Sequence, residues 1–263
     1  MSALAWPGRI KQALGDRYRA EAYLILDYLR APAPAGARPD AEFAALLTGK
    51  RVALVGPAPT VQGSGQGPRI DAHDVVVRLN HAVPIPPNLR PDVGTRTEVL
   101  YHNLSFTGPD KLPLSEFLPL LPASGMWICS PCPYIRWLPG TIGRIDAVVQ
   151  ALDGRLPFRT MPPRRYLRLY ARLRGMPNAG VCAIRDLMGF ALRGLYMTGF
   201  TFYAGGTEYY QGYRGRGMAS QLHDQAAQRN LVARWVRRDP RLRVDDPMRE
   251  ILFGPPPQGG RDR

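Results

Sequence analysis

The chain has 263 residues, of which 45% are hydrophobic, and its formal net charge is +14. This length is enough for one α/β domain with a sizeable core, and the hydrophobic content excludes a disordered protein. The positive charge favours an anionic partner but by itself leaves nucleotides, acidic sugars, nucleic acid and anionic membranes open. Because the three cysteines, Cys129, Cys132 and Cys182, are few and odd in number, they do not indicate a secreted disulfide framework. No stretch reaches about 18 consecutive apolar residues, so we expect no transmembrane anchor.

The N-terminal part of the chain is predicted to be an extension. Residues 9–30 repeat apolar side chains at helical spacing and carry basic ones between them, which predicts an amphipathic helix. Such a helix could lie on a membrane surface or pack on the domain. The Pro- and Ala-rich residues 31–40 are typical of a linker. We therefore expect residues 1–47 to form a helical extension with a linker, 48–253 the main domain and 254–263 a disordered tail.

Apolar runs and helical patterns alternate in the main domain. Strands are predicted at 51–55, 74–79, 97–102, 126–130, 195–200 and 241–244. Helices are predicted at 142–152, 163–174, 180–193 and 220–239. Because strands alternate with helices, we expect a single Rossmann-like α/β domain with a mostly parallel central sheet flanked by helices, plus the N-terminal helix.

The stretch from Val52 to Ala82 is the first candidate for a binding site. Its glycines form GxGxG rather than GxGxxG and do not open a periodic helix, which excludes a dinucleotide fingerprint. Gly56 follows the first strand at the carboxyl edge of the sheet, where a tight turn would expose backbone N–H groups to a phosphate. Asn80 ends the second strand, and its amide could donate to and accept from a base edge or a ribose.

The polar residues between these two positions are open to two interpretations. They are Asp71, His73 and Asp74, with Arg78 on the second strand. They could contribute to a ligand site, or they could only shape a turn and pair with Arg78.

The residues "VALVGPAP" and "IDAHDVVVRLNHA" resemble the large sialylmotif of family 29 glycosyltransferases, the eukaryotic-type sialyltransferases, and "DVGTRTEVLYH" from Asp92 is similar to its continuation. Residues 177–200 resemble the small sialylmotif. "TEYYQ" at 207–211 and "HDQAAQ" at 223–228 stand where the family has its third motif and its H-x4-E motif. The four motifs follow the order of the family over about residues 48–238.

This resemblance implies a variant GT-A type fold and an inverting transfer reaction. The sugar would be sialic acid or a related acid such as Kdo, moving from its CMP ester to a hydroxyl of a glycan or glycolipid acceptor. No cofactor is implied, since the CMP-sugar is the donor substrate, and the absence of a D-x-D motif gives no reason to expect a metal. The expected partners are therefore the donor and the acceptor, with peripheral association with an anionic membrane and without nucleic acid. The expected location is the bacterial cytoplasm or the surface of its inner membrane.

The resemblance also implies a set of site residues. His223 would be the general base, and the donor-binding residues would be Gly56, Pro57, Asn80, Asn178, Ala179, Gly180, Glu208, Tyr209 and Tyr210. On the sequence alone, Ser220 would cap a helix and place His223 in its first turn, where the helix dipole disfavours imidazolium. The alternative is that His223 is an ordinary surface residue.

Two of the donor-binding groups also have structural interpretations. The turn at 177–180 opens a helix whose N-terminus could bind an anion, and Asn178 could be a plain helix cap, which is compatible with anion binding. Tyr209 and Tyr210 could stack on cytosine or lie at the edge of the core.

The sequence departs from the family pattern in several places. Pro57 replaces an Asn, Glu208 a His and Gln228 a Glu, and the cysteine pair that joins the large and small motifs is absent. Loss of that pair agrees with a reducing cytoplasm. A carboxylate at Glu208 would repel the donor phosphate, for which Arg214 and Arg216 could compensate. These departures keep a second function open, namely a catalytically weakened CMP- or RNA-binding protein on the same fold.

Overall fold

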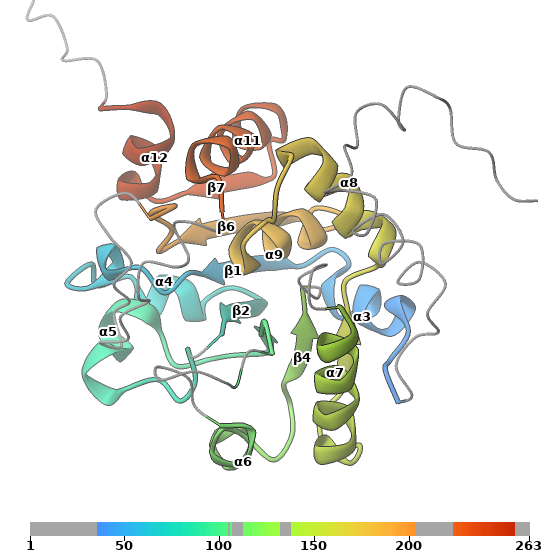
Figure 1. Cartoon of the computed structure of the whole chain (residues 1–263). Coiled ribbons are helices and arrows are strands. Elements are labelled where there is room, and N and C mark those ends of the chain that lie inside the picture. Colours follow the sequence, from blue (N-terminus) through green and yellow to red (C-terminus); the bar gives the residue numbers. More distant parts are fainter. Residues whose placement is uncertain are drawn as a thin grey trace, which may run out of the picture.

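The computed structural model describes residues 36–80, 82–104, 106, 113–131, 138–203 and 223–255. Within these residues seven strands form one parallel sheet with the order β5-β4-β3-β2-β1-β6-β7 (Figure 1). The strands are β1 (Arg51–Val55), β2 (Val75–Leu79), β3 (Val99–Tyr101), β4 (Trp127–Ser130), β5 (Phe158–Thr160), β6 (Gly194–Thr198) and β7 (Leu242–Val244). The parallel α/β sheet expected from the sequence is confirmed.

Helices surround this sheet. The α-helices are α3 (Asp40–Leu47), α4 (Gly67–Asp71), α5 (Arg90–Val93), α6 (Leu114–Phe117), α7 (Leu138–Leu152), α8 (Pro163–Leu173), α9 (Ala179–Leu187), α11 (Gln225–Arg238) and α12 (Asp246–Phe253). The described residues also contain three 3-10 helices, η1 (Pro59–Val61), η2 (Pro87–Leu89) and η3 (Leu118–Leu120).

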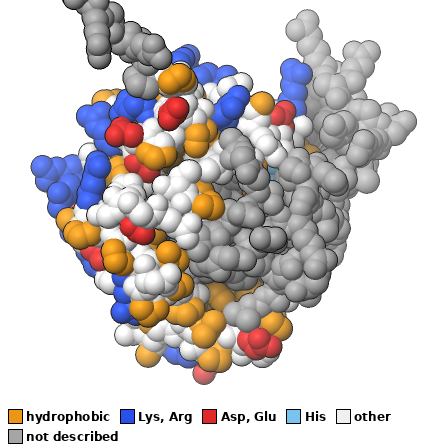
Figure 2. Space-filling model, turned by 90° about the vertical axis from the view of Figure 1, so that its left-hand side faces the viewer, with side chains coloured by type: hydrophobic (Ala, Val, Ile, Leu, Met, Phe, Trp, Pro, Cys, Tyr) orange, Lys and Arg blue, Asp and Glu red, His pale blue; other side chains and the backbone are white. Residues whose placement is uncertain are grey.

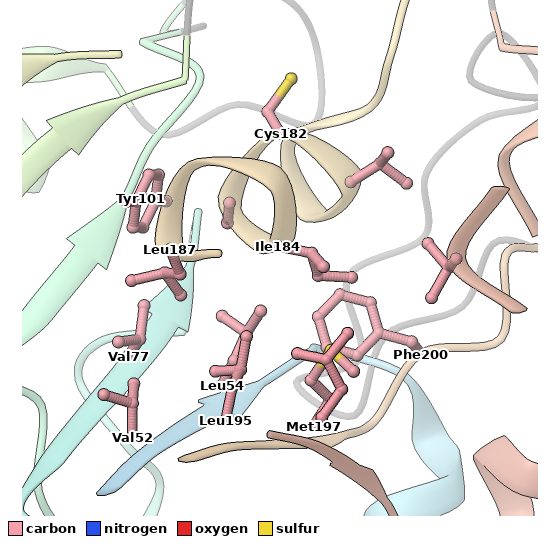
Figure 3. Packing of buried hydrophobic residues seen from close by; sticks show 14 of the residues in the cluster. Val52, Leu54, Val77, Tyr101, Cys182, Ile184, Leu187, Leu195, Met197 and Phe200 are labelled. Carbon is pink, nitrogen blue, oxygen red and sulfur yellow. The ribbon is translucent and has the colours of Figure 1, made fainter. Parts of the chain in front are cut away.

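The two faces of the sheet bury different sets of helices because side chains alternate along each strand. On β1, Val52 and Leu54 belong to a core shared with α3, α8, α9, α11 and α12. Their neighbours Ala53 and Val55 point to the other face, where they pack with side chains of α4 and α5. Farther along that face, α6 and α7 cover β3, β4 and β5. Figure 3 shows α9 lying over the first face, with Ile184 and Leu187 close to the strand side chains. Both faces are covered, as is usual for a parallel sheet.

The structure differs from the expected elements at several points. β5 and α12 were not predicted, and α9 ends at Leu187 rather than at residue 193. Residues 40–47, assigned from the sequence to the N-terminal extension, form α3, whose Phe43 and Leu47 are completely buried in the main core. Burial of these two side chains makes α3 part of the packed domain. The predicted helix at 9–30 and residues 256–263 lie outside the described residues.

A fully buried carboxylate fixes α9 to the sheet. Asp186 accepts hydrogen bonds from the Tyr101 hydroxyl at 2.8 Å and from Arg159 at 2.5 Å, and it also pairs with Arg165. Arg159 in turn binds Asp40 of α3 at 2.8 Å. Burial raises the pKa of Tyr101 well above its usual value, which keeps the hydroxyl protonated as a donor. Three helices, α3, α8 and α9, and two strands, β3 and β5, therefore share one charge network.

The two cysteines that the structure describes, Cys129 and Cys182, are free thiols in the core. Burial raises the pKa of Cys129 to about 12, so this thiol stays protonated at neutral pH. No disulfide therefore contributes to the packing in the described part of the chain.

The buried network leads to a prediction about stability. Replacement of Asp186 by Ala leaves Arg159 buried without its main counter-charge, which typically costs about 3–5 kcal/mol. We expect the free energy of unfolding, measured by urea denaturation, to fall by this amount. Glu250→Ala, at an exposed position on α12, is the matched control and should change it by no more than about 0.5 kcal/mol. Equal stability of the two variants would contradict the assignment.

Candidate functional site

The strand order places a candidate site at the carboxyl ends of β1 and β6. From β1 the chain adds strands in one direction through β2 to β5, and β6 and β7 then add on the opposite side. In open parallel sheets, ligands bind at the carboxyl edge at such a change of direction. Gly56 follows β1 and Gly199 follows β6 at this edge.

The backbones at Gly56 and Gly199 approach each other too closely for side chains. A Cβ atom on Gly56 would lie 2.2 Å from the carbonyl oxygen of Gly199, and one on Gly199 would lie 2.4 Å from that of Gly56. Gly56 donates its N–H to Thr198 at 2.8 Å, and Ala58 donates its N–H to Gly199 at 3.1 Å. Pairing of the two chain segments therefore continues beyond the strands, and both positions require glycine.

These bonds correct one expectation from the sequence. The turn after β1 was expected to expose N–H groups to a phosphate. The N–H groups of Gly56 and Ala58 are instead occupied by backbone carbonyls, and Pro57 has none. Gly56 or Pro57 could therefore contact a donor substrate only through their carbonyl oxygens or by van der Waals contact. Donor groups for an anion must come from another element at this edge.

The N-terminus of α9 can supply them. Asn178 caps the helix, and its Oδ1 accepts the N–H of Val181 at 2.8 Å, as the sequence suggested. The N–H groups of Ala179 and Gly180 are among the first in the helix and have no acceptor in the part of the chain that the structure describes. A Cβ atom on Gly180 would lie 2.7 Å from the ring of Phe200, so glycine lets the helix start pack directly beyond Gly199. This helix start therefore presents backbone N–H donors at the carboxyl edge, the kind of group that suits an anion.

Two side chains near the start of α11 hold the segment that leads into α9. The ring of His223 bonds through Nδ1 to the carbonyl oxygen of Met176 at 2.9 Å. The side-chain oxygen of Gln228 accepts the N–H of Asn178 at 2.9 Å. We call His223 and Gln228 the α11 clamp. Gln228 had been noted in the sequence only as a departure from the family Glu, because a buried side chain bonding to a distant backbone N–H leaves no local signal.

The bond to Met176 determines which nitrogen of His223 is basic. A carbonyl oxygen only accepts, so Nδ1 carries the proton, and in the neutral ring the lone pair is on Nε2. The ring is 6% exposed and lies parallel to that of Tyr203, with centroids 6.3 Å apart. Burial lowers the pKa of His223 from 6.5, and the bond to Met176 opposes this only in part. The ring is therefore neutral at pH 7.

The position of His223 also differs from the sequence expectation. Helix α11 begins at Gln225, with Asp224 as its N-cap, so His223 precedes the helix instead of lying in its first turn. The expected capping residue, Ser220, is outside the described residues. Since the ring is buried, the alternative of a surface residue is wrong, and burial rather than the helix dipole is the main cause of the lowered pKa.

Asn80 lies at the same edge of the sheet, directly after β2. It adopts a left-handed backbone conformation with φ of 48°, which asparagine tolerates better than most residues. Its N–H donates to the carbonyl oxygen of Tyr101 at 2.7 Å, and its Oδ1 accepts the N–H of Asn103 at 3.0 Å. The side-chain Nδ2 is then the group that can donate to a ligand.

The polar residues before β2 have structural roles. The carboxylate of Asp71 accepts the N–H of Thr95, and that of Asp74 accepts the N–H of Arg51. Arg78 is completely buried and donates to backbone carbonyl oxygens of the segment 93–96. His73 bonds through Nδ1 to backbone carbonyls at the end of α4. These residues shape the turn, but the pairing of Asp71 or Asp74 with Arg78 that the sequence suggested does not form.

Some of the predicted site residues fall outside the described part of the chain. These are Glu208, Tyr209, Tyr210, Arg214 and Arg216. Among the residues that are described, no group of three or more His, Cys, Asp or Glu side chains could hold a metal ion. Likewise, no helix within the described ranges is long and apolar enough to cross a membrane.

Comparison with known proteins confirms the predicted family resemblance. Residues 28–115 match the model of glycosyltransferase family 29 (sialyltransferase). The fold is similar to the crystal structure of a mammalian sialyltransferase in complex with Gal-beta-1-3GalNAc-ortho-nitrophenol, with a TM-score of 0.55 and 20% sequence identity. It is also similar to another crystal structure of a mammalian sialyltransferase, with a TM-score of 0.54 and the same identity. Each comparison covers 88% of this chain and 85% of the other. No curated protein sequence matches.

The matched residues contain Gly56, Pro57 and Asn80 but not the α9 helix start or the α11 clamp. For those later elements, the resemblance rests on the sequence motifs and on the shared fold.

Proposed function

We propose that this protein is an inverting glycosyltransferase. The chain matches the sialyltransferase family over residues 28–115 and shares the sialyltransferase fold. Its donor is the CMP ester of sialic acid or of a related acidic sugar such as Kdo. Its acceptor is a hydroxyl of a glycan or glycolipid. The family match and the fold support transfer of sialic acid, whereas the CMP donor and the catalytic base are part of the proposal.

The α11 clamp is the observation that carries this proposal. It ties His223, through Met176, to the segment that ends at the N-cap of α9. The proposed base is thereby anchored at Met176, three residues before the first residue of α9, Ala179. Transfer from an anionic donor requires these two groups to keep a fixed separation.

In the proposed reaction, Nε2 of His223 takes the proton of the acceptor hydroxyl as its oxygen attacks the anomeric carbon of the donor. The bond between that carbon and the phosphate oxygen breaks, and CMP leaves with the electron pair. A neutral imidazole suits this step, because a protonated ring could not accept the proton. The N–H groups of Ala179 and Gly180 would bind the carboxylate or phosphate of the donor, and Asn80 would bind its cytosine or ribose.

The alternative is a catalytically weakened CMP- or RNA-binding protein, which Glu208 in place of the family His favours. Calorimetry with CMP and with polyuridylate separates the two proposals. We expect CMP to bind and polyuridylate to compete poorly. Tight binding of polyuridylate without a preference for CMP would support the alternative.

The role of His223 as base leads to a mutational prediction. His223→Ala should lower kcat by about 10²–10⁴ while the Kd for CMP stays within about twofold, because the partner of the base is the acceptor hydroxyl. The measurements are CMP release and calorimetry. His73→Ala, a histidine in the turn before β2, is the control and should retain activity. If CMP affinity falls in step with kcat, His223 binds the donor phosphate instead of acting as the base.

The pH dependence of turnover follows from the lowered pKa of His223. Only the neutral ring is active, so kcat should be constant near neutral pH and fall as the pH drops through the pKa of the ring. Because burial lowers that pKa in the folded protein, the midpoint should lie below 6.5. A pH profile of kcat measured with saturating donor tests this. A midpoint above 6.5 would contradict the buried environment of the ring.

Asn80 provides a separate test of the donor site. Asn80→Asp keeps the oxygen that accepts the N–H of Asn103, but it replaces the Nδ2 donor with an acceptor oxygen and adds a negative charge. We expect the Kd for CMP to rise at least about fivefold while the melting temperature changes little, since loss of a hydrogen bond to a ligand costs about 1–3 kcal/mol. Asn80→Gly, which tolerates the left-handed backbone without adding a charge, is the matched variant. If both variants bind CMP normally, Asn80 is not part of the site.

A further inference from the structure

Helices α8 and α11 are unusually basic. Each contains four arginines and no carboxylate. The two helices pack against each other next to α9 (Figure 1). By contrast, the face shown in Figure 2 has Asp and Glu side chains among its Lys and Arg side chains.

The arginines of α8 are separated from its apolar side. Tyr166, Leu169 and Leu173 are buried in the core. Arg164, Arg168 and Arg172 follow one another at intervals of four residues and are exposed. Residues four apart lie on the same side of a helix, so these three guanidinium groups form a row along α8. We call Arg164, Arg168 and Arg172 the α8 arginine row.

Few negative charges are available to neutralise this row. Asp186 is the only acidic residue between positions 154 and 203, and it is completely buried and already paired with Arg159 and Arg165. Arg185 of α9 lies within electrostatic range of α8. Burial lowers the pKa of Arg185, and repulsion from arginines of α8, including two from the row, lowers it further. The positive charge is therefore concentrated where α8 meets α9.

We propose that the α8 arginine row binds the phosphate headgroups of an anionic lipid surface. Guanidinium groups pair with phosphate through two parallel hydrogen bonds, and several basic side chains on one surface add their attraction to an anionic bilayer.

A lipid surface fits these observations better than a single-stranded nucleic acid. Proteins that bind single strands combine positive charge with aromatic side chains on which bases stack. On α8, Tyr166 is buried, and on α11, Trp235 packs against the core. Among the described residues, Leu120 on the other side of the sheet is the sole large hydrophobic side chain that is exposed. Binding would thus be electrostatic, without insertion of apolar groups, and sensitive to salt.

The basic helices are connected to the candidate site along the chain. Helix α8 leads directly into the segment held by the α11 clamp, and α11 begins two residues after His223. A lipid surface bound by these helices would hold the protein among acceptors carried by the same surface. The lipid binding itself does not depend on the proposed function.

The experiment is co-sedimentation of the full-length protein with two kinds of vesicle. One is pure phosphatidylcholine, and the other is phosphatidylcholine with about 30% phosphatidylglycerol. We expect binding only to the anionic vesicles, with loss at about 0.5 M salt. Each basic side chain near such a surface strengthens binding about fivefold, so the Gln variant of all three residues in the row should bind on the order of 100-fold more weakly. The matched control replaces Arg90, Arg243 and Arg249, exposed arginines on other elements, with Gln.

Each outcome of this experiment decides the proposal. Vesicle binding that the row variant loses and the control variant keeps supports it. Equal loss in both variants would show that only net charge matters, and unchanged binding in the row variant would place the contact elsewhere; either result overturns the proposal. Binding of polyuridylate that depends on the row, without vesicle binding, would assign the surface to nucleic acid. CMP affinity, measured on the same variants, should be unchanged, which separates this test from that of the proposed function.

Discussion

The close approach of the backbones at Gly56 and Gly199 is the constraint on which the candidate site depends. It extends the pairing of β1 and β6 beyond the sheet. The N–H groups of Gly56 and Ala58 in the β1 turn are bonded to backbone carbonyls, so they cannot donate to a ligand. Gly180 makes a second close approach, against Phe200, which places the start of α9 beside the same turn. In the described part of the chain, the start of α9 therefore supplies backbone N–H donors at this edge that the β1 turn does not. Close packing accounts for Gly56 and Gly67 of this stretch, whereas Gly63 and Gly65 meet no atom within 4 Å and instead adopt positive φ angles.

The α11 clamp gives a physical account of one departure from the family pattern. The residue at position 228 accepts the N–H of Asn178, and this requires an acceptor oxygen, which Gln supplies as a Glu would. The remaining Nε2 of Gln228 is buried and has no partner among the described residues, which costs stability, but the bond to Asn178 needs only the side-chain oxygen and is preserved. The replacement of Glu by Gln is thus weaker support for a catalytically inactive protein than the sequence suggested. His223 keeps its buried position and its basic Nε2 because the same segment anchors both side chains.

Much of the architecture could be predicted because alternation and helical spacing are local signals. The apolar runs at 51–55 and 74–79 predicted β1 and β2, and Asn178, a preferred N-cap residue, predicted the start of α9. Short elements were not predicted. β5 has three residues, which are too few to show alternation. α3 follows directly on a Pro- and Ala-rich stretch, so it was assigned to the linker although its Phe43 is buried. Contacts between residues far apart in the chain, such as those of Gln228 and Asp186, could not be predicted because they produce no periodic pattern in the sequence. The start of α11 was misplaced because Ser220 and Asp224 are both acceptable caps, and only the fold selects Asp224.

The proposed site combines His223 as the base, the start of α9 as the anion-binding group and Asn80 as the nucleotide-binding amide at the edge of a sialyltransferase fold. Turnover of CMP-sugars tests this proposed activity most directly. The purified protein would be incubated with CMP-sialic acid and with CMP-Kdo, with and without a panel of glycan acceptors, and release of CMP would be followed over time. The account predicts release from at least one of these donors at a rate that an acceptor increases and that His223→Ala abolishes. Binding of CMP without release from either donor, under all acceptors, would contradict the assignment as an enzyme and leave a CMP-binding protein in its place.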